Sequence, residues 1–125
     1  RMMRKLKTMI LALFTAWGVY AADITPITEA MKSGNTGALS GSMYTEADVS
    51  VPGVSQRASA AEAAAILGRF FQGNPPTGFT VVHQADKNGG GFVVGKLQTA
   101  SREYRVNITY VLKDGRALMQ TIRIE

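Results

Sequence analysis

The stretch YRVNITYVL, from Tyr104 to Leu112, decides the fold because apolar and polar residues alternate along its whole length. Every second side chain is apolar, and in an extended strand these side chains share one face, while an arginine, an asparagine and a threonine share the other. Most of its residues are β-branched or aromatic, the types that favour strands. The pattern predicts a long strand with one buried face.

Turns flank this strand on both sides. The sequence Lys113-Asp114-Gly115-Arg116 follows it, and Asp-Gly is a preferred pair for a type I′ hairpin. A looser turn at Gln98–Arg102 precedes it. The strand is therefore expected to lie centrally in an antiparallel sheet. Three further alternating segments complete a four-strand meander: Phe79–Gln84, Phe92–Leu97 and Ala117–Glu125.

A helix from Ser59 to Gln72 is expected to cover the apolar face of this sheet. Ser59 and Glu62 have the spacing of a capping box, in which each side chain bonds the other residue's backbone N–H. Gly73 and Pro75-Pro76 end the helix. Its apolar stripe, with helical spacing, consists of Ala63, Ile66, Leu67 and Phe70, flanked by Phe71.

Two shorter helices and a short strand are predicted before that helix. Thr25 is expected to cap the first helix, with Pro26 at its first position and Gly34 as its stop. Asn35 caps a second helix, in which Leu39 and Met43 share a face. The segment Asp48–Pro52 reads as a short edge strand. Helices followed by strands predict an α+β fold: N-terminal helices packed on the concave face of a bent antiparallel sheet.

The charge is concentrated at the start of the chain. The formal net charge is +5, and four basic residues fall within the first seven positions, so the remainder carries ten basic and nine acidic residues. This balance argues against a nucleic-acid partner. The basic start, the apolar run Thr8–Tyr20 and the small residues of Val19-Tyr20-Ala21 together predict a signal peptide.

The signal peptide is predicted to span residues 1–21, followed by a single domain at 22–125. Cleavage is expected after Ala21, with Ala22 as the alternative. The apolar run is shorter than the roughly 20 residues of a transmembrane helix, although an uncleaved anchor stays an alternative. We expect a protein exported to the periplasm or secreted, without a stable membrane anchor after cleavage.

The composition limits the available chemistry. Without cysteine, the chain has neither disulfides nor thiolate ligands. His83 is its one histidine, so we expect no metal site and no cofactor. The carboxylates Glu46 and Asp48, two residues apart, are interpreted as a solvated edge. The sequence indicates no set of catalytic residues.

Three residues are candidates for ligand binding: His83, Tyr104 and Tyr110. In the predicted strand His83 shares a face with Phe79 and Val81, which turns it toward the core near the strand end. The two tyrosines mark the ends of the apolar face of the central strand. They could line a cavity with their hydroxyls as polar groups, or be core residues whose hydroxyls reach the rim.

Several segments together resemble a known family. They include Ile27-x-x-Ala30-Met31, Val49-Ser50-Val51-Pro52-Gly53, Phe79-x-Val81-x-His83 and the closing Ile122-Arg123-Ile124. With the helix that ends in Phe70-Phe71, they are similar to a family of small exported bacterial proteins of unknown function. That family has the nuclear transport factor 2-like, or cystatin-like, fold, so the resemblance implies a cone of bent sheet around helices.

The resemblance also bears on function. Enzymes of this superfamily place a histidine–aspartate dyad, or a tyrosine with aspartates, inside the cone. The predicted inward faces of the later strands here hold no acid, so we expect a non-catalytic module that binds a small molecule or a protein. A homodimer through the sheet is one such arrangement. The alternative is a small isomerase, dehydratase or hydrolase with a pocket in the cone and His83 as its base.

Overall fold

The computed structural model describes residues 22–125, which form three helices and six strands. The signal peptide predicted at 1–21 lies outside the described residues. Within those residues, no helix combines the length and apolar character needed to cross a membrane. In chain order the elements are α2 Thr25–Ser33, α3 Thr36–Gly41, β1 Met43–Val51, β2 Val54–Ser59, α4 Ala60–Gly73, β3 Pro76–Lys87, β4 Gly90–Thr99, β5 Glu103–Lys113 and β6 Arg116–Ile124.

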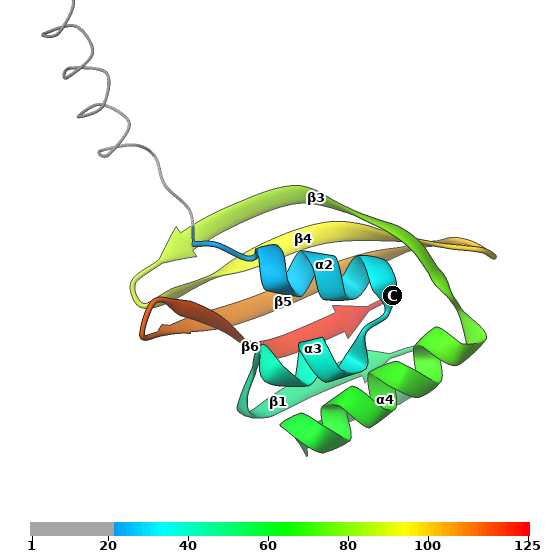
Figure 1. Ribbon diagram of the computed structural model, residues 1–125, viewed down its shortest axis with the longest axis horizontal. Coiled ribbons are helices and arrows are strands. Elements are labelled where there is room, and N and C mark those ends of the chain that lie inside the picture. Colours follow the sequence, from blue (N-terminus) through cyan, green and yellow to red (C-terminus); the bar gives the residue numbers. More distant parts are fainter. Residues whose placement is uncertain (1–21) are drawn as a thin grey trace, which may run out of the picture.

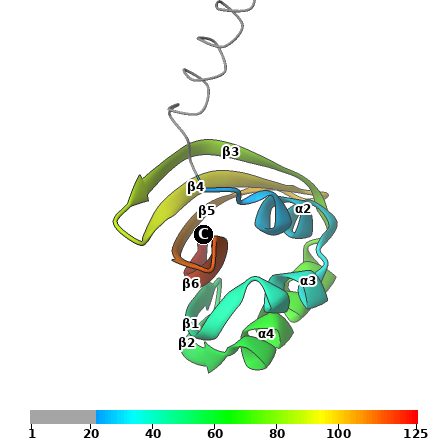
Figure 2. The ribbon, with the colours of Figure 1, turned by 60° about the vertical axis from the view of Figure 1, so that its left-hand side comes forward.

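The six strands form one mixed sheet in the order β2-β1-β6-β5-β4-β3 (Figures 1 and 2). The four later strands make the predicted antiparallel meander, with β5 between β4 and β6. The expectation of a wholly antiparallel sheet is wrong at one junction, because β1 pairs with β6 in parallel. After β1, β2 and α4, the chain enters the far edge of the sheet at β3 and returns through β4 and β5 to β6. By this path β6 lies beside β1 and runs in the same direction.

The sheet bends around the helices, which all lie on its concave side (Figure 2). Helix α2 packs against β3, whereas α4 lies along β1 and β2 and contacts α3. The predicted covering helix therefore lies mainly over one half of the sheet. It reaches the central strand at its last turn, where the ring centroids of Phe70 and Tyr104 are 5.1 Å apart. We call the side that carries the helices the inner face, and the opposite side the outer face.

The central strand behaves as its alternation predicts. Tyr104, Val106, Ile108 and Tyr110 are all buried on the inner face of β5. The turn that follows has the type I′ conformation: φ is 53° at Asp114 and 77° at Gly115, and glycine adopts positive values without steric cost. The α+β architecture built on this strand is confirmed.

Local signals place the helix ends well. Ser59 and Glu62 form the expected capping box, Asn35 accepts from the Ala38 N–H at 3.1 Å, and Gly34 is left-handed with φ of 69°. The cap of α2 was placed one residue late, since Ile24 is its N-cap and Thr25 its first residue. The carboxylate of Asp23 accepts from the Thr25 N–H at 3.0 Å and supplies the missing side-chain cap.

The first strand differs most from its prediction. Strand β1 is nine residues long and lies between β2 and β6, so it is neither short nor an edge. It begins at Met43, which was assigned to the second helix. The unpredicted strand β2 forms the edge instead, after a turn at Pro52-Gly53. In β2 the buried residue is Ala58 and the rest are exposed, so the sequence carries no alternation there.

Candidate functional site

His83 lies on the outer face and is exposed to solvent. The pairing of β3 with β4 shifts by one residue between Val81 and His83, so that Val81 faces Gly95 and His83 faces Val94. The extra residue, Val82, is a β-bulge, and it reverses the alternation of the strand beyond it. The prediction that His83 faces the core is therefore wrong. Its ring instead lies 5.6 Å from that of Phe92.

Tyr104 belongs to the core, with its hydroxyl at the rim. Its side chain is 7% exposed, and its hydroxyl donates to the Asn74 side-chain oxygen at 2.8 Å just beyond α4. Phe70 meets the ring edge-on, and the Arg102 guanidinium lies 4.7 Å from the ring centroid. The hydroxyl thus joins β5 to the end of α4, which is a packing role.

Tyr110 stands at the other end of the same face, beside two polar residues of β3. Its hydroxyl donates to the Asp86 carboxylate at 2.7 Å and accepts from the Gln84 amide at 3.2 Å, while its side chain is 2% exposed. Burial, and then the bond to Asp86, raise the pKa of the Tyr110 hydroxyl above its usual range. We call Gln84, Asp86 and Tyr110 the mouth cluster.

A glycine makes room for this cluster. A Cβ atom at Gly91 would lie 2.5 Å from the Tyr110 hydroxyl oxygen, closer than a Cβ atom approaches a non-bonded atom. Strand β4 therefore needs glycine opposite Asp86 for the tyrosine to reach the carboxylate. The glycine run at residues 89–91, which spans the end of the turn and the start of β4, therefore shapes the site.

Gln84 and Asp86 are not among the predicted site residues. Unbroken alternation along the predicted strand Phe79–Gln84 places Gln84 on the face opposite Phe79, and Asp86 lies beyond the predicted end of that strand, so no acid is expected on the inner face. The bulge at Val82 turns them inward. The available signal was the pair Val81-Val82, two adjacent apolar residues in an otherwise alternating strand.

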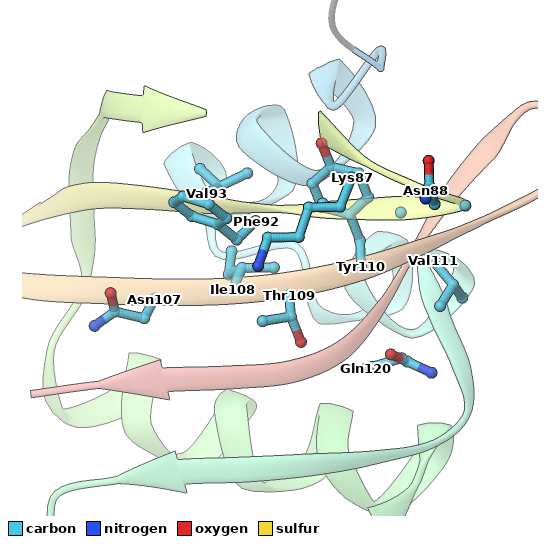
Figure 3. Close-up of a pocket in the computed structure, with 13 residues that line it drawn as sticks. Lys87, Asn88, Phe92, Val93, Asn107, Ile108, Thr109, Tyr110, Val111 and Gln120 are labelled. Carbon is cyan, nitrogen blue, oxygen red and sulfur yellow. The ribbon is translucent and has the colours of Figure 1, made fainter. Parts of the chain in front are cut away.

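The outer face is hollowed into grooves. One groove, with a volume of about 530 Å³, runs between the turn at Asn88 and strands β4 to β6 (Figure 3). Its lining offers side-chain amides, a hydroxyl, a cation and an aromatic ring. Lys87 lies 5.7 Å from the centroid of the Phe92 ring. The polar side chains that line it are Lys87, Asn88, Asn107, Thr109 and Gln120.

Two more grooves continue this surface. One, of about 490 Å³, shares Asn107 with the first and extends to Arg57 on β2. There Arg57 bonds Glu46 at 2.9 Å and Asp48 at 3.3 Å. Both carboxylates are solvated as predicted, although β1 is not an edge strand. The other, of about 500 Å³, includes Val82 and Val94. The outer face thus combines hydrogen-bonding groups with partly exposed apolar side chains.

The three predicted ligand residues therefore do not meet in one pocket. His83 is on the outer face, and the two tyrosines end the inner face at opposite ends of β5. Among the residues at 22–125, no three histidine, aspartate or glutamate side chains gather in a way that could hold a metal ion. The mouth cluster presents a carboxylate suited to a cation, and the outer face presents an open polar and apolar surface.

Comparison with known proteins gives the family. Residues 24–125 match the family described as Domain of unknown function (DUF4783). The crystal structure of a DUF4783 family protein from Bacteroides ovatus is 28% identical, with a TM-score of 0.77 over 84% of this chain and 96% of that chain. No protein with a curated description matches the chain.

More distant structures share the fold alone. A variant of the Rd1NTF2 protein is 16% identical, with a TM-score of 0.67 over 82% of this chain and 92% of that chain. A Silicibacter pomeroyi protein with a cystatin-like fold is 14% identical, with a TM-score of 0.59 over 81% of this chain and 70% of that chain. The predicted nuclear transport factor 2-like, cystatin-like fold is confirmed.

Proposed function

The chain belongs to the DUF4783 family, a domain of unknown function, and we propose that it is an exported, non-catalytic module that binds a protein partner on the outer face of its sheet. The observation that carries this proposal is the contrast between the two faces. On the inner face the helices and large apolar side chains pack together, and both tyrosine hydroxyls are bonded within the protein. The grooves that cross several strands lie on the outer face.

The shape of these grooves favours a protein over a small molecule. The lining residues of the first groove all come from strands β3 to β6 and from the turn between β3 and β4, so the sheet forms a floor that no helix roofs. Small-molecule sites bury roughly 70–90% of their ligand. A small molecule on this floor would keep one side in water, whereas a protein surface would cover the floor.

Apolar exposure supports the same choice. Val82 is 57% exposed at the bulge, and Phe92, Val94 and Val111 are partly exposed on the neighbouring strands. Val82 and Val94 line one groove together, and Phe92 and Val111 line another. Apolar side chains grouped on a surface and rimmed by polar ones are typical of protein contact sites.

The enzymatic alternative, with His83 as a base inside the cone, gains no support, because the bulge places His83 on the outer face. The acid that the bulge turns inward, Asp86, is bonded to the Tyr110 hydroxyl and the Ala22 nitrogen.

A pair of matched substitutions tests the proposal. Val82→Asp puts a charge on the outer face, and Val54→Asp puts one on the exposed first residue of β2, which pairs with Val51 away from the grooves. Both positions are exposed, so both variants should fold, as circular dichroism melts will show. Each variant and the unchanged protein serve as bait in a periplasmic extract of the producing organism, while native mass spectrometry of the pure protein tests for a second copy.

We expect Val82→Asp to lower the affinity for the partner, or for a second copy of the chain, by at least about tenfold, because a charge must be desolvated at the contact. Val54→Asp should bind as the unchanged protein does. Equal binding by Val82→Asp, or loss confined to Val54→Asp, would contradict the proposal.

A further inference from the structure

The mouth cluster holds the first described residue, Ala22. The Ala22 nitrogen donates to both carboxylate oxygens of Asp86, at 3.1 Å and 3.3 Å. The Gln84 amide nitrogen donates to the Ala22 carbonyl at 2.9 Å, and the Tyr110 hydroxyl donates to the same carboxylate. Ala22 is half-buried, and it packs against the core. The residue is thus held at its nitrogen, its carbonyl and its side chain.

These contacts suit an ammonium group better than a peptide N–H. A peptide nitrogen has one hydrogen to donate, whereas an α-ammonium has three and a positive charge. Here two carboxylate oxygens lie within hydrogen-bonding distance of one nitrogen. A carboxylate forms a charge-assisted hydrogen bond with either donor, but only an ammonium group adds the attraction between two opposite charges. The carboxylate of Asp86 therefore gains most if the nitrogen of Ala22 is a chain terminus.

The sequence independently predicts that this nitrogen becomes a terminus. Cleavage after Ala21 adds water across the Ala21–Ala22 peptide bond, so that the leader departs with the Ala21 carboxylate and Ala22 keeps the ammonium group. We propose that Asp86, Gln84 and Tyr110 form a receptor site for the α-ammonium group of Ala22, which fixes the processed N-terminus to β3. The inference rests on the export assumed in the proposed function.

The receptor site also distinguishes the two predicted cleavage positions. Cleavage after Ala22 would remove the carbonyl that Gln84 binds and the methyl group that packs on the core. It would also make Asp23 the first residue, and its carboxylate already accepts from the Thr25 N–H. We therefore infer that the processed chain begins at Ala22. Because α2 starts three residues later and packs on β3, the anchored terminus also fixes the start of that helix.

The first experiment determines the intact mass of the protein exported with its own leader. We expect a chain that begins at Ala22. A chain that begins at Asp23, or one that keeps its leader, would overturn the inference about the terminus. The binding assay with Val82→Asp and Val54→Asp would be unaffected by a start at Asp23, so the two proposals fail separately.

The second experiment measures how fast acetic anhydride modifies the α-amine at neutral pH. It uses a chain that starts at Ala22, which contains all the described core residues and elements. Asp86→Asn is the test variant, and Glu29→Gln, which removes an exposed carboxylate on α2, is the control. The ion pair keeps the amine protonated, so the unchanged protein and the control should react roughly three- to tenfold more slowly than Asp86→Asn.

A further variant keeps every side chain and moves the α-ammonium group away from Asp86. One glycine added before Ala22 displaces the ammonium group from Asp86 by a residue, so its amine should react at the faster rate of Asp86→Asn even if that substitution perturbs folding. High salt should also narrow the difference between the unchanged protein and Asp86→Asn. Equal rates in the unchanged protein and the glycine-extended chain would overturn the receptor site.

Discussion

The inner and outer faces of the sheet are built from the same strands but differ in how far packing constrains their residues. On the inner face, side chains such as Val106 and Ile108 are fully buried, and the polar groups at its ends are bonded within the protein. On the outer face the alternate residues of the same strand, such as Asn107 and Thr109, line open grooves. Packing thus determines the inner residues, and the outer ones are free to serve recognition.

The largest expected effect is the loss of an aromatic ring of α4 that packs against the inner face. Phe70 is 8% exposed and contacts the rings of Phe71 and Tyr104 at centroid distances of 5.7 and 5.1 Å. Phe70→Ala should cost about 3–5 kcal/mol of unfolding free energy because it leaves a cavity. Phe92→Ala on the outer face should cost roughly 0.5–1.5 kcal/mol. Urea unfolding of both variants measures the difference, and similar losses would remove the distinction between the faces.

A second prediction concerns the close packing of the inner face. A Cβ at Gly95 would lie 2.5 Å from the Phe79 ring and 2.9 Å from the Thr80 carbonyl oxygen. Gly95→Ala should therefore cost about 1–3 kcal/mol through overpacking. Gly73→Ala is the matched control, because its Cβ would meet nothing within 4 Å. Thermal melts should show a clear loss for Gly95→Ala alone, and an unchanged Tm for that variant would contradict the packing described.

The mouth cluster predicts a smaller, pH-dependent effect. Tyr110→Phe removes a hydroxyl bonded to Asp86 and Gln84 and should cost about 1 kcal/mol at neutral pH. Because the folded state raises the pKa of this hydroxyl, the folded protein keeps its proton while the unfolded chain loses it above pH 10.0.

Stability should therefore fall as the pH rises above that value, and Tyr110→Phe should remove this part of the fall. Absorbance titration of the phenolates provides the direct measurement. The unchanged protein should contain a late-titrating tyrosine that is absent from Tyr110→Phe and present in a Tyr44→Phe control. A late tyrosine that persists in Tyr110→Phe would assign the raised pKa elsewhere.

The smallest effect is expected at the ion pairs of the outer face. Arg57 bonds Glu46 and Asp48, and all three side chains are more than half exposed. Solvent and salt screen such pairs. Arg57→Gln should therefore leave the melting temperature unchanged within error at physiological salt. A large drop in Tm would mean that this part of the outer face stabilises the fold.

The sequence predicted the elements whose burial repeats regularly. The alternation of Tyr104–Leu112, the Asp-Gly turn and the Ser59 capping box each depend on contacts within a few residues, and each was confirmed. Strand β2 was missed because it buries Ala58 and little else, so its pairing with β1 leaves no periodic pattern. The parallel pairing of β1 with β6 joins segments from the two ends of the domain, so no pattern within a few residues indicates it.

The site was harder to predict because one inserted residue controls it. The bulge at Val82 moves His83 outward and brings Gln84 and Asp86 to Tyr110. A bulge depends on the pairing partner as well as on its own strand, and alternation along a single strand does not reveal where it falls. The alternation within β5 is enough to identify Tyr110. Its polar partners Gln84 and Asp86 can be identified only from the pairing of β3 with β4.

Photo-crosslinking in the producing organism tests most directly whether the outer face is the binding surface. A photoreactive amino acid would replace Val94 or Thr109 on the outer face, and Gln72 or Lys32 on exposed helix surfaces as matched controls. We predict one discrete adduct, of the same mass, from both outer-face positions and none from the helix positions. Adducts confined to the helix positions, or absent from both outer-face positions, would contradict the account.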